Sequence, residues 1–549
     1  MNAADVSALP VQALPGLADQ VRRQILETVS RRGGHLSSSL GAVELVIALL
    51  RAFDPRSDRV LWDVGHQAYA WKILTDRGEK FGSLRQIDGI SGFPNPDESA
   101  YDAFVAGHAG ASLAVARGMA AARDLKGGSE HIVAIIGDAS LANGMALEAL
   151  EGFRGGRRLI LVLNDNGSGS VQLDSETLLK TFGFRVLPRQ DGHDILALEK
   201  AFSHAKVFDG PIAIPVRTVK GRGFAPAEEN PEAWHGVGAF DLSSPTPKKV
   251  GVAMSWSEAF GRALTDLARR DSRVCALTAA MGEGTGLSGF ANEFPDRFFD
   301  VGICEENLVA FAAGLAKAGM RPVVAVYSTF LQRAIDQVMH DVCLLKLPVV
   351  FAVDRAGCVG HDGRTHHGMF DIPMLRCLPG LTIAQPSSAD ELRGMLVLAL
   401  ESNAPWVIRY PRGRAADFRG DATAVKLGVA SQLFGESAHL QIWALGDQVL
   451  KARRIAEVLE ARGKTVGVVD ARFVKPFDAR LLKRQRIDGD VIVSLENGSV
   501  LGGFGEAIGA DLRLGWPDEF VDHGAVEDLE RRHGLDVESL ASRIEEFVR

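Results

Sequence analysis

The chain has 549 residues, of which 46% are hydrophobic and 24% charged, and its net charge at pH 7 is −8. This length is typical of about three globular domains, no apolar run approaches the roughly 20 residues that a membrane span needs, and the acidic balance argues against nonspecific nucleic-acid binding. The five cysteines are scattered without metal-ligand spacing and the N-terminus does not resemble a secretory signal, so we expect reduced thiols in a cytoplasmic protein.

The first unit, from about residue 15 to 240, alternates helical patterns with apolar strands, and three of its segments place a histidine directly after a glycine. They are residues 33–37, 62–67 and 107–110, which carry His35, His66 and His108. Glycine permits close backbone approach and unusual dihedral angles. For a single Gly-His pair, an ordinary loop or core histidine would be the better interpretation. Three such pairs in one unit favour a functional site.

Two apolar runs later in the same unit, residues 131–136 and 159–163, predict buried parallel strands with a helix between them. Asp138 follows the first run, and Asn166 closes the second. Ligands of open α/β sheets gather at the carboxyl ends of the strands, and Mg2+ prefers oxygen ligands and often holds a phosphate as well. The Gly137-Asp138 turn also opens a helix, whose N-terminus favours an anion. The pattern therefore predicts a Mg2+-bridged diphosphate.

Polar stretches at residues 242–249 and 414–421 divide the rest of the chain. The second unit has apolar runs at 323–327 and 348–353, and the third has them at 440–444, 465–469 and 490–494. Strands that alternate with helices in all three units predict an α/β fold of three consecutive parallel-sheet domains. A Gly-rich turn at residues 501–505 in the third unit could bind an anion, but packing and dimerisation are the interpretation that we favour.

From about residue 15 to its C-terminus, the chain resembles the family of 1-deoxy-D-xylulose-5-phosphate synthases, which are transketolase-like thiamine-diphosphate enzymes. The resemblance implies a diphosphate-binding domain at residues 1–245, a pyrimidine-binding domain at 246–420 and a C-terminal transketolase-like domain at 421–549. The matching segments include GGHLSSSLGAVELVIALL, LWDVGHQAYAWKIL, SGFP, LVLNDN, DGHD, VKGRGFAPAE, DVGICEENLVAFAAGLA, YSTFLQRAIDQVMHDV, DRAGCVGHDGRTHHGMFD and IRYPRG.

The resemblance implies thiamine diphosphate and Mg2+ as cofactors, with the diphosphate held by the first unit and the aminopyrimidine by the second. The implied metal ligands are the side chains of Asp138 and Asn166 and the backbone carbonyl of Ser168. The other positions that match the family's cofactor site are His66, Gly107, His108, Ala109, Ala139, Ser140, Lys220, Phe224, Glu305 and Phe330.

Glu305 matches the family's catalytic glutamate. Its carboxyl group would hydrogen-bond a ring nitrogen of the aminopyrimidine and so activate the cofactor, which carries out the difficult chemistry. Without that match, Glu305 could be read as a residue that caps a helix on the surface. The match of the whole segment around it argues against this purely structural role.

The implied reaction condenses pyruvate with D-glyceraldehyde 3-phosphate, releases CO2 and gives 1-deoxy-D-xylulose 5-phosphate. Arg355 and Arg412 match the phosphate-binding arginines, and Tyr327 lies beside them in the motif; arginine suits phosphate because its planar fork donates two parallel hydrogen bonds. The family default is a homodimer acting on small molecules. The polar positions that match the substrate site are His35, His235, Asp362 and His366.

The chain departs from the family at several positions. Family members have glycine at the place of Ala139, Glu-Met-Ser-Ile in place of residues 167–170, Gln-His in place of residues 306–307, and a longer segment after Asn166. If residue 139 needs φ > 0, an alanine there costs about 1 kcal/mol. These departures leave open a paralogue with another donor or acceptor, a ketol transfer of the transketolase type, and a catalytically silent regulatory homologue. The presence of Asp138 and Glu305 argues against the silent homologue.

Overall fold

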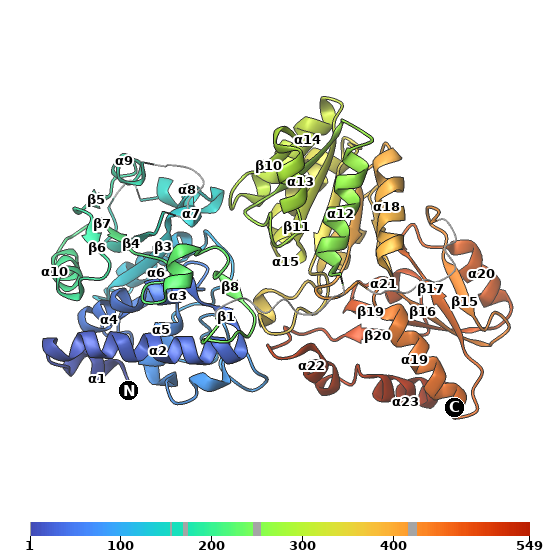
Figure 1. Cartoon of the computed structure of the whole chain (residues 1–549), viewed down its shortest axis with the longest axis horizontal. Coiled ribbons are helices and arrows are strands. Elements are labelled where there is room, and N and C mark those ends of the chain that lie inside the picture. Colours follow the sequence, from blue (N-terminus) through green and yellow to red (C-terminus); the bar gives the residue numbers. More distant parts are fainter. Residues whose placement is uncertain (1, 154–155, 168–173, 245–253, 416–424) are drawn as a thin grey trace. The chain divides into compact units, whose positions relative to one another are not determined.

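The computed structural model describes residues 2–153, 156–167, 174–244, 254–415 and 425–549. The chain forms two compact units (Figure 1). Unit 1 contains Met1–Val250 and His361–Thr365, and unit 2 contains Gly251–Gly360 and His366–Arg549. The expected domain boundaries near residues 245 and 420 both fall outside the described residues and stay predictions. No helix in the described ranges is both long and apolar enough to cross a membrane.

Unit 1 is built on a six-stranded parallel sheet of order β2-β3-β4-β7-β5, with β6 also paired to β7. The strands of this unit are β1 (Gly34–His35), β2 (Arg59–Trp62), β3 (Ile132–Gly137), β4 (Leu159–Asp165), β5 (Arg185–Val186), β6 (Gln190–Asp191), β7 (Pro211–Arg217) and β8 (Gly236–Val237). Its main helices are α1 (Ala3–Ala8), α2 (Leu14–Arg32), α3 (Ser37–Gly41), α4 (Val43–Ala52), α5 (Tyr69–Lys72), α6 (Ser112–Leu125), α7 (Asp138–Leu141), α8 (Gly144–Glu151), α9 (Ser175–Thr181), α10 (Ile195–Lys206) and α11 (Ala225–Glu229).

Helices cover both faces of this sheet. Val133 and Ile135 of β3 belong to the core cluster that includes α2, α4 and α10, whereas Ala134 and Ile136 belong to the cluster that includes α6 and α8. A strand buried on both faces needs an uninterrupted apolar run, which explains why β3 and β4 could be predicted to within two residues at each end.

Unit 2 contains two sheets. The seven-stranded sheet has the order β10-β9-β11-β12-β14-β13-β18, and the five-stranded sheet has the order β15-β17-β16-β19-β20. The strands are β9 (Val274–Thr278), β10 (Phe298–Asp300), β11 (Arg321–Tyr327), β12 (Val350–Asp354), β13 (Thr382–Ala384), β14 (Trp406–Arg409), β15 (Ser431–Phe434), β16 (Leu440–Ala444), β17 (Gly467–Asp470), β18 (Phe473–Lys475), β19 (Val491–Ser499) and β20 (Leu512–Trp516). The main helices are α12 (Trp256–Ala268), α13 (Ser288–Glu293), α14 (Glu305–Lys317), α15 (Ser328–Leu331), α17 (Asp371–Arg376), α18 (Ala389–Glu401), α19 (Gln448–Ala461), α20 (Ala479–Ile487), α21 (Phe504–Ala507), α22 (Val526–Arg532) and α23 (Val537–Phe547).

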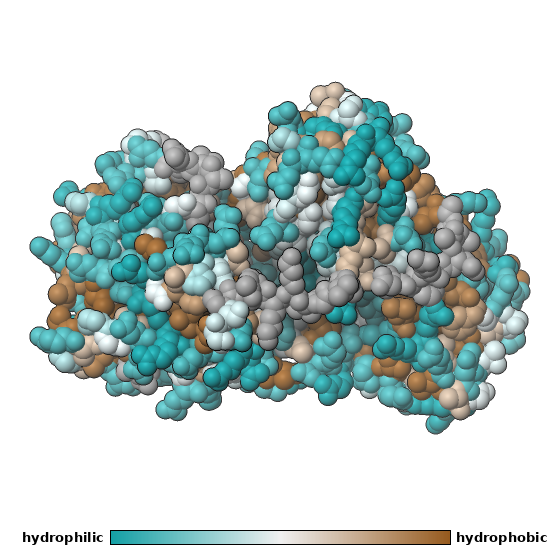
Figure 2. All heavy atoms as spheres, viewed as in Figure 1, coloured by the Kyte–Doolittle hydropathy of each residue, from teal (hydrophilic) through white to brown (hydrophobic). Residues whose placement is uncertain are grey.

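The predicted α/β fold with parallel sheets is confirmed, with one addition. The edge strands β18 and β15 run antiparallel to their neighbours β13 and β17. An antiparallel edge strand is common on an otherwise parallel sheet. Figure 2 shows hydrophilic side chains over most of one face of each unit, with apolar residues in small groups, as on ordinary protein surfaces.

The Gly-rich turn at residues 501–505 already holds an anion of its own chain. The buried carboxylate of Glu496 accepts hydrogen bonds from the backbone N–H groups of Phe504 (2.7 Å) and Gly505 (2.8 Å) at the start of α21. Burial raises the pKa of Glu496 to about 7. The turn therefore packs on a carboxyl group of its own chain, in agreement with the packing interpretation, and its role in dimerisation stays a prediction.

Candidate functional site

The predicted metal ligands of unit 1 follow neighbouring parallel strands. In the pairing of β3 with β4, Gly137 lies opposite Asn164. Asp138 then begins α7, and Asn166 comes directly after β4, so both lie at the carboxyl edge of the sheet. Ser168 lies outside the described residues. The expected helix start at Asp138 is confirmed.

Lys220 lies close enough to Asp138 for their charges to interact. Burial lowers the pKa of the half-buried Lys220, and the negative charge of Asp138 partly opposes that effect. One carboxylate, one amide and a nearby ammonium group fit a diphosphate that is bridged by a hard cation. No group of three or more His, Cys, Asp or Glu side chains in the described part of the chain could hold a metal by itself.

Ala139 and Ser140 both lie within α7. Because Ala139 has a right-handed helical backbone there, the condition of a positive φ is not met, and the alanine carries no such strain. The family's glycine at this position is not required by this backbone. Ser140 is buried, and its side chain hydrogen-bonds the carboxylate of Asp63.

Asp63 anchors the segment that carries Gly107, His108 and Ala109. Directly after β2, its buried carboxylate accepts hydrogen bonds from the backbone N–H groups of Gly110 (2.9 and 3.0 Å) and Ser112 (3.1 Å). Burial raises the pKa of Asp63 even though these hydrogen bonds favour the charged form. A carboxylate with several donors of this kind fixes the backbone of a loop.

A short piece of chain from the second half of the sequence, residues 361–365, belongs to unit 1. His108 Nε2 donates to the carbonyl oxygen of Thr365 at 2.9 Å, and a Cβ on Gly107 would lie only 2.6 Å from the Thr365 Cβ. Arg85 donates to Asp362 Oδ1 at 2.5 Å. Asp362 therefore lies in unit 1, whereas His366, four residues later and also predicted in the substrate site, lies in unit 2.

Three of the predicted histidines form a cluster in unit 1. The ring centroids of His66 and His235 are 5.0 Å apart, and His35 lies 5.8 Å from His235 and 6.1 Å from His66. The antiparallel pairing of β1 with β8 brings the strand of His35 beside the segment that follows His235. Burial, then the neighbouring His235 and His35, lower the pKa of His66 well below its usual value. Its buried Nδ1 has no hydrogen-bond partner among the described residues, so a neutral imidazole faces the cluster.

Phe224, another predicted cofactor contact, packs against an aromatic group of unit 1. Its ring lies 5.2 Å from that of Trp234 and 6.2 Å from that of Phe240. This packing positions the 219–224 segment, which also carries Lys220. The contacts of Phe224 and Lys220 with a cofactor stay predictions.

In unit 2, Glu305 is the first residue of α14 and is only 4% exposed. Its Oε2 atom has no hydrogen-bond partner within the described residues and lies 3.6 Å from Arg333 Nη1. Burial raises the pKa of Glu305; Arg333 opposes the rise, and Glu306 adds to it. The expectation that Glu305 is no surface cap is confirmed. Such a carboxyl group holds its proton to a higher pH than a solvated glutamate does and has an oxygen free for a ligand.

The other predicted groups of unit 2 lie around the end of β11. The rings of Tyr327 and Phe330 stack at 5.7 Å, and the ring of His366 meets Phe330 edge-on at 5.6 Å. The Arg355 guanidinium lies 3.7 Å from the Tyr327 ring centroid, and its Nη1 donates to the carbonyl oxygen of Gly284 at 3.1 Å. The structure therefore brings Tyr327, Phe330, Arg355 and His366 together.

The second phosphate candidate, Arg412, is linked to the same region through Asp354. Burial raises the pKa of the Asp354 carboxyl, and the charges of Arg355 and Arg412 both oppose that rise. Asp354 also accepts a hydrogen bond of 2.6 Å from Ser257 Oγ. Two arginines beside one buried acid leave a net positive charge, which suits an anionic acceptor.

Sequence reasoning missed several residues that support the site, among them Asp63, Arg333 and Asp354. Asp63 directly follows β2, and Asp354 is the last residue of β12. Asp138 was predicted because it directly follows an apolar strand, and the same criterion would have identified these two acids. Arg333 carries no such signal, because its relation to Glu305 depends on how α14 packs.

Comparisons with known proteins show the family to which the chain belongs. Residues 1–172 match the family described as 1-deoxy-D-xylulose-5-phosphate synthase, residues 252–416 the pyrimidine binding domain of transketolase, and residues 432–540 the C-terminal domain of transketolase. The 1-deoxy-D-xylulose-5-phosphate synthase 1 of Geobacter sulfurreducens is 43% identical over 615 aligned residues, which cover 99% of this chain and 96% of that protein. The 1-deoxy-D-xylulose-5-phosphate synthase of Aquifex aeolicus is 41% identical, with 99% and 97% covered.

Both alignments are longer than the chain itself, so these relatives carry residues that this chain lacks. Among solved structures, the transketolase of Campylobacter jejuni matches with a TM-score of 0.51 and 19% identity over 98% of this chain and 100% of that one. A transketolase from Leishmania mexicana matches with a TM-score of 0.50 and 18% identity over 97% of each chain. At this level of identity, the structural likeness shows the fold alone.

Proposed function

This chain belongs to the family of 1-deoxy-D-xylulose-5-phosphate synthases, and we propose that it condenses pyruvate with D-glyceraldehyde 3-phosphate, with loss of CO2, to give 1-deoxy-D-xylulose 5-phosphate. One observation carries the proposal: identity of 41–43% to named synthases extends over 99% of the chain. The chain also keeps a buried Glu305 whose Oε2 atom has no hydrogen-bond partner among the described residues.

The residues present fit thiamine diphosphate and Mg2+. Asp138 and Asn166 would hold the metal ion with their side-chain oxygens, and the Lys220 ammonium group would face the diphosphate. Phe330 offers an aromatic face to the cofactor ring. When bound, the cofactor supplies a nucleophilic carbon and accepts the electron pair that CO2 leaves behind.

Glu305 is placed to exchange a proton through its carboxyl group. Its raised pKa keeps the group neutral over more of the pH range, and its Oε2 has no competing hydrogen bond among the described residues. A neutral, buried acid can donate a hydrogen bond to a ring nitrogen and exchange its proton there. The contribution of such a positioned acid is on the order of 10²–10⁴-fold in rate.

The acceptor requires binding of a phosphate and proton transfer at oxygen. Arg355 and Arg412 would bind the phosphate, since Arg355 is held over Tyr327 and both charges act on Asp354. The cluster of His35, His66 and His235 offers imidazole groups that can exchange protons at substrate oxygens, and burial lowers the pKa of His66 and His235. Asp362 and His366 stay candidates for holding hydroxyl groups.

A homodimer is the state that we propose for this protein. Exposed apolar side chains gather on α14 and the adjoining segment at residues 338–346: Phe311 is 38% exposed, Met339 49%, Leu344 69% and Leu345 56%. Helix α14 packs against the helical turn Val338–Cys343. Contiguous exposed apolar surface commonly marks an interface. Light scattering should show a dimer that Leu344→Glu weakens. A cytoplasmic location also stays a prediction; all five cysteines are free thiols.

The decisive experiment is a screen of 2-oxo acid donors and aldehyde acceptors that follows CO2 and the new ketose. Pyruvate with D-glyceraldehyde 3-phosphate should be the best pair. Glu305→Gln should abolish turnover without unfolding the protein, while Glu401→Gln, an exposed change in the same unit, should leave turnover intact. Product from a ketose donor, or from another acceptor in preference, would favour a ketol transferase or a paralogue. Tight cofactor binding without CO2 release from any 2-oxo acid would favour the silent homologue.

A further inference from the structure

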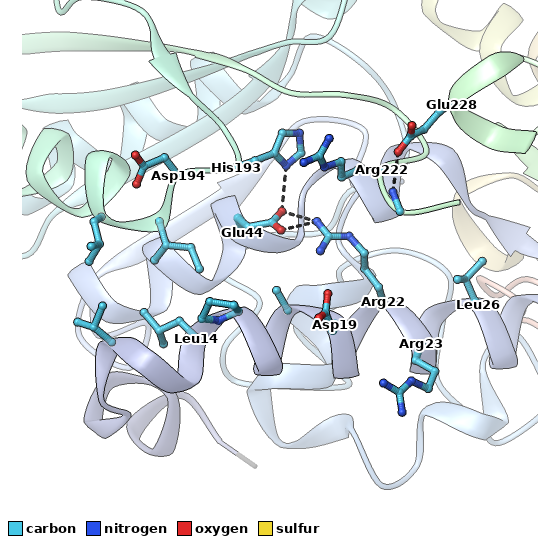
Figure 3. Close-up of a pocket in the computed structure, with 16 residues that line it drawn as sticks. Leu14, Asp19, Arg22, Arg23, Leu26, Glu44, His193, Asp194, Arg222 and Glu228 are labelled. Atoms are coloured by element: carbon cyan, nitrogen blue, oxygen red, sulfur yellow. Dashed lines mark hydrogen bonds and ion pairs between the residues drawn. The ribbon is translucent and has the colours of Figure 1, made fainter. Parts of the chain in front are cut away.

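A pocket of about 830 Å3 lies in unit 1, on the side where α2 and α10 pack, and plays no part in the proposed reaction. Figure 3 shows side chains from α2, from α4 and from the loops that precede α10 and follow β7 around it. Its size is in the range of pockets that bind small molecules, about 300–1,000 Å3. The lining combines apolar residues with several arginines, acids and one histidine.

The floor of the pocket is a buried, ordered polar group. Arg22 Nη2 donates to both carboxylate oxygens of Glu44 at 2.5 Å, and His193 Nδ1 lies 3.0 Å from Glu44 Oε2. Burial alone would raise the pKa of Glu44, but the hydrogen bonds from His193 and Arg22 outweigh burial and lower the pKa. Arg22 is only 9% exposed, and its Nε has no hydrogen-bond partner among the described residues. In the floor, the charge of Arg22 therefore balances that of Glu44, and the Nε–H group of Arg22 is left as a donor without a partner among the described residues.

Most acids of the lining are already engaged. Glu44 is bonded to Arg22 and His193. Asp194 caps α10 by accepting a hydrogen bond from the N–H of Ala197, and Glu228 accepts one from the N–H of Gly223. Asp19 is the remaining acid of the lining, on α2.

Two arginines of the lining, Arg23 and Arg222, are exposed, and no ion pair in the described ranges engages either of them. In Figure 3, Arg23 points away from the Arg22–Glu44 pair, whereas Arg222 lies on the same side of that pair as His193. Leu14, Leu26, Ile195 and Leu196 also line the pocket, with Leu14 and Leu26 at separate places along α2. A pocket lined by an exposed guanidinium group and by apolar side chains suits a ligand with an anionic head and a short apolar chain.

The pocket is also joined to the segment that carries Lys220. His193 Nε2 accepts a hydrogen bond of 3.0 Å from the backbone N–H of Val219, and Arg222 follows Lys220 by two residues. A ligand that binds Arg222 and packs on this floor would therefore order the 219–224 segment.

We propose that this pocket is a second small-molecule site, for an amphiphile with one anionic head and a short apolar chain. Hexyl phosphate is a suitable probe, with inorganic phosphate and hexanol as its two halves. Titration calorimetry on the full chain, saturated with thiamine diphosphate and Mg2+, should show that hexyl phosphate binds at least 10-fold more tightly than either half.

Matched variants locate the binding. Arg222→Ala and Leu196→Glu should each weaken binding of hexyl phosphate at least 10-fold. Arg31→Ala, also on α2 but outside the lining, and Leu125→Glu, at a fully solvated position, should change it less than twofold. Thermal unfolding of each variant checks that the fold is kept. No binding to the unaltered chain, equal binding to Arg222→Ala and the unaltered chain, or loss of binding in Arg412→Ala, which would place the probe at the acceptor phosphate site, would overturn the proposal. None of these outcomes depends on turnover.

Discussion

Replacement of Asp63 by alanine separates the role of this carboxylate in stability from its role in the site. The change removes the acceptor of the Gly110 and Ser112 N–H groups. Each buried donor left without a partner costs about 1–3 kcal/mol, so the sum is roughly 2–6 kcal/mol. Burial raises the pKa of Asp63, which means that burying the ionised carboxylate destabilises the folded state. Removal of the carboxylate also removes this destabilising contribution. We expect a loss of about 2–4 kcal/mol in the free energy of unfolding.

Asp58 offers a matched control at the opposite end of β2. It is also buried, and its carboxylate accepts hydrogen bonds from the N–H groups of His131 (2.8 Å) and Asp54 (3.1 Å). Asp58→Ala should therefore lose a similar amount of stability.

Cofactor affinity is where the two variants should differ. The loop that Asp63 holds carries Gly107, His108 and Ala109, so Asp63→Ala should weaken thiamine diphosphate at least 10-fold, equivalent to about 1.4 kcal/mol, whereas Asp58→Ala should change it less than twofold. Urea titration measures stability, and calorimetry well below both melting midpoints measures affinity. Equal loss of affinity in both variants would show that general destabilisation, not the loop anchor, is responsible.

Three further outcomes are expected. Arg412→Ala should raise the acceptor KM about 10-fold or more, since a hydrogen bond to a charged group contributes about 1.5–3 kcal/mol, while CO2 release from pyruvate alone stays within twofold; steady-state kinetics that show an unchanged acceptor KM would remove Arg412 from the phosphate site. Glu496 has a folded-state pKa of about 7, above its unfolded value of 4.5, so ionisation of this group lowers the stability of the folded protein as pH rises from 4.5 to 7, by about 3 kcal/mol in all. The free energy of unfolding, measured across that range, should fall with this slope in the unaltered chain and should not do so in Glu496→Gln. An equal slope in both proteins would contradict the assignment. Gly110→Ala should lower the free energy of unfolding by about 2 kcal/mol, because Gly110 has a φ of +86° and a Cβ there would lie 2.3 Å from Oδ1 of Asn143, the residue that caps α8. Gly118→Ala, in open space on α6, should leave stability unchanged or raise it when both variants are compared by thermal unfolding.

The amino-acid sequence by itself determined the strands and the edge at which the chemistry lies. The runs that became β3 and β4 are continuously apolar because both faces of the sheet are covered, and parallel pairing then sets Asp138 and Asn166 at one edge. The segment around Glu305 was recognisable for a different reason, since its residues match a family motif rather than a periodic pattern. These features depend on neighbours along the chain, and a sequence displays such neighbours directly.

Only the tertiary structure decided how distant segments support those residues. Asp63 binds the backbone of Gly110, which lies 47 residues later in the chain. Arg85 pairs with Asp362, which lies 277 residues later. The helical backbone at Ala139 and the internal anion Glu496 at the Gly-rich turn likewise follow from surrounding contacts. No local period or propensity encodes such contacts, because each is selected by the packing of the whole unit and by the need of every buried charge and N–H group for a partner.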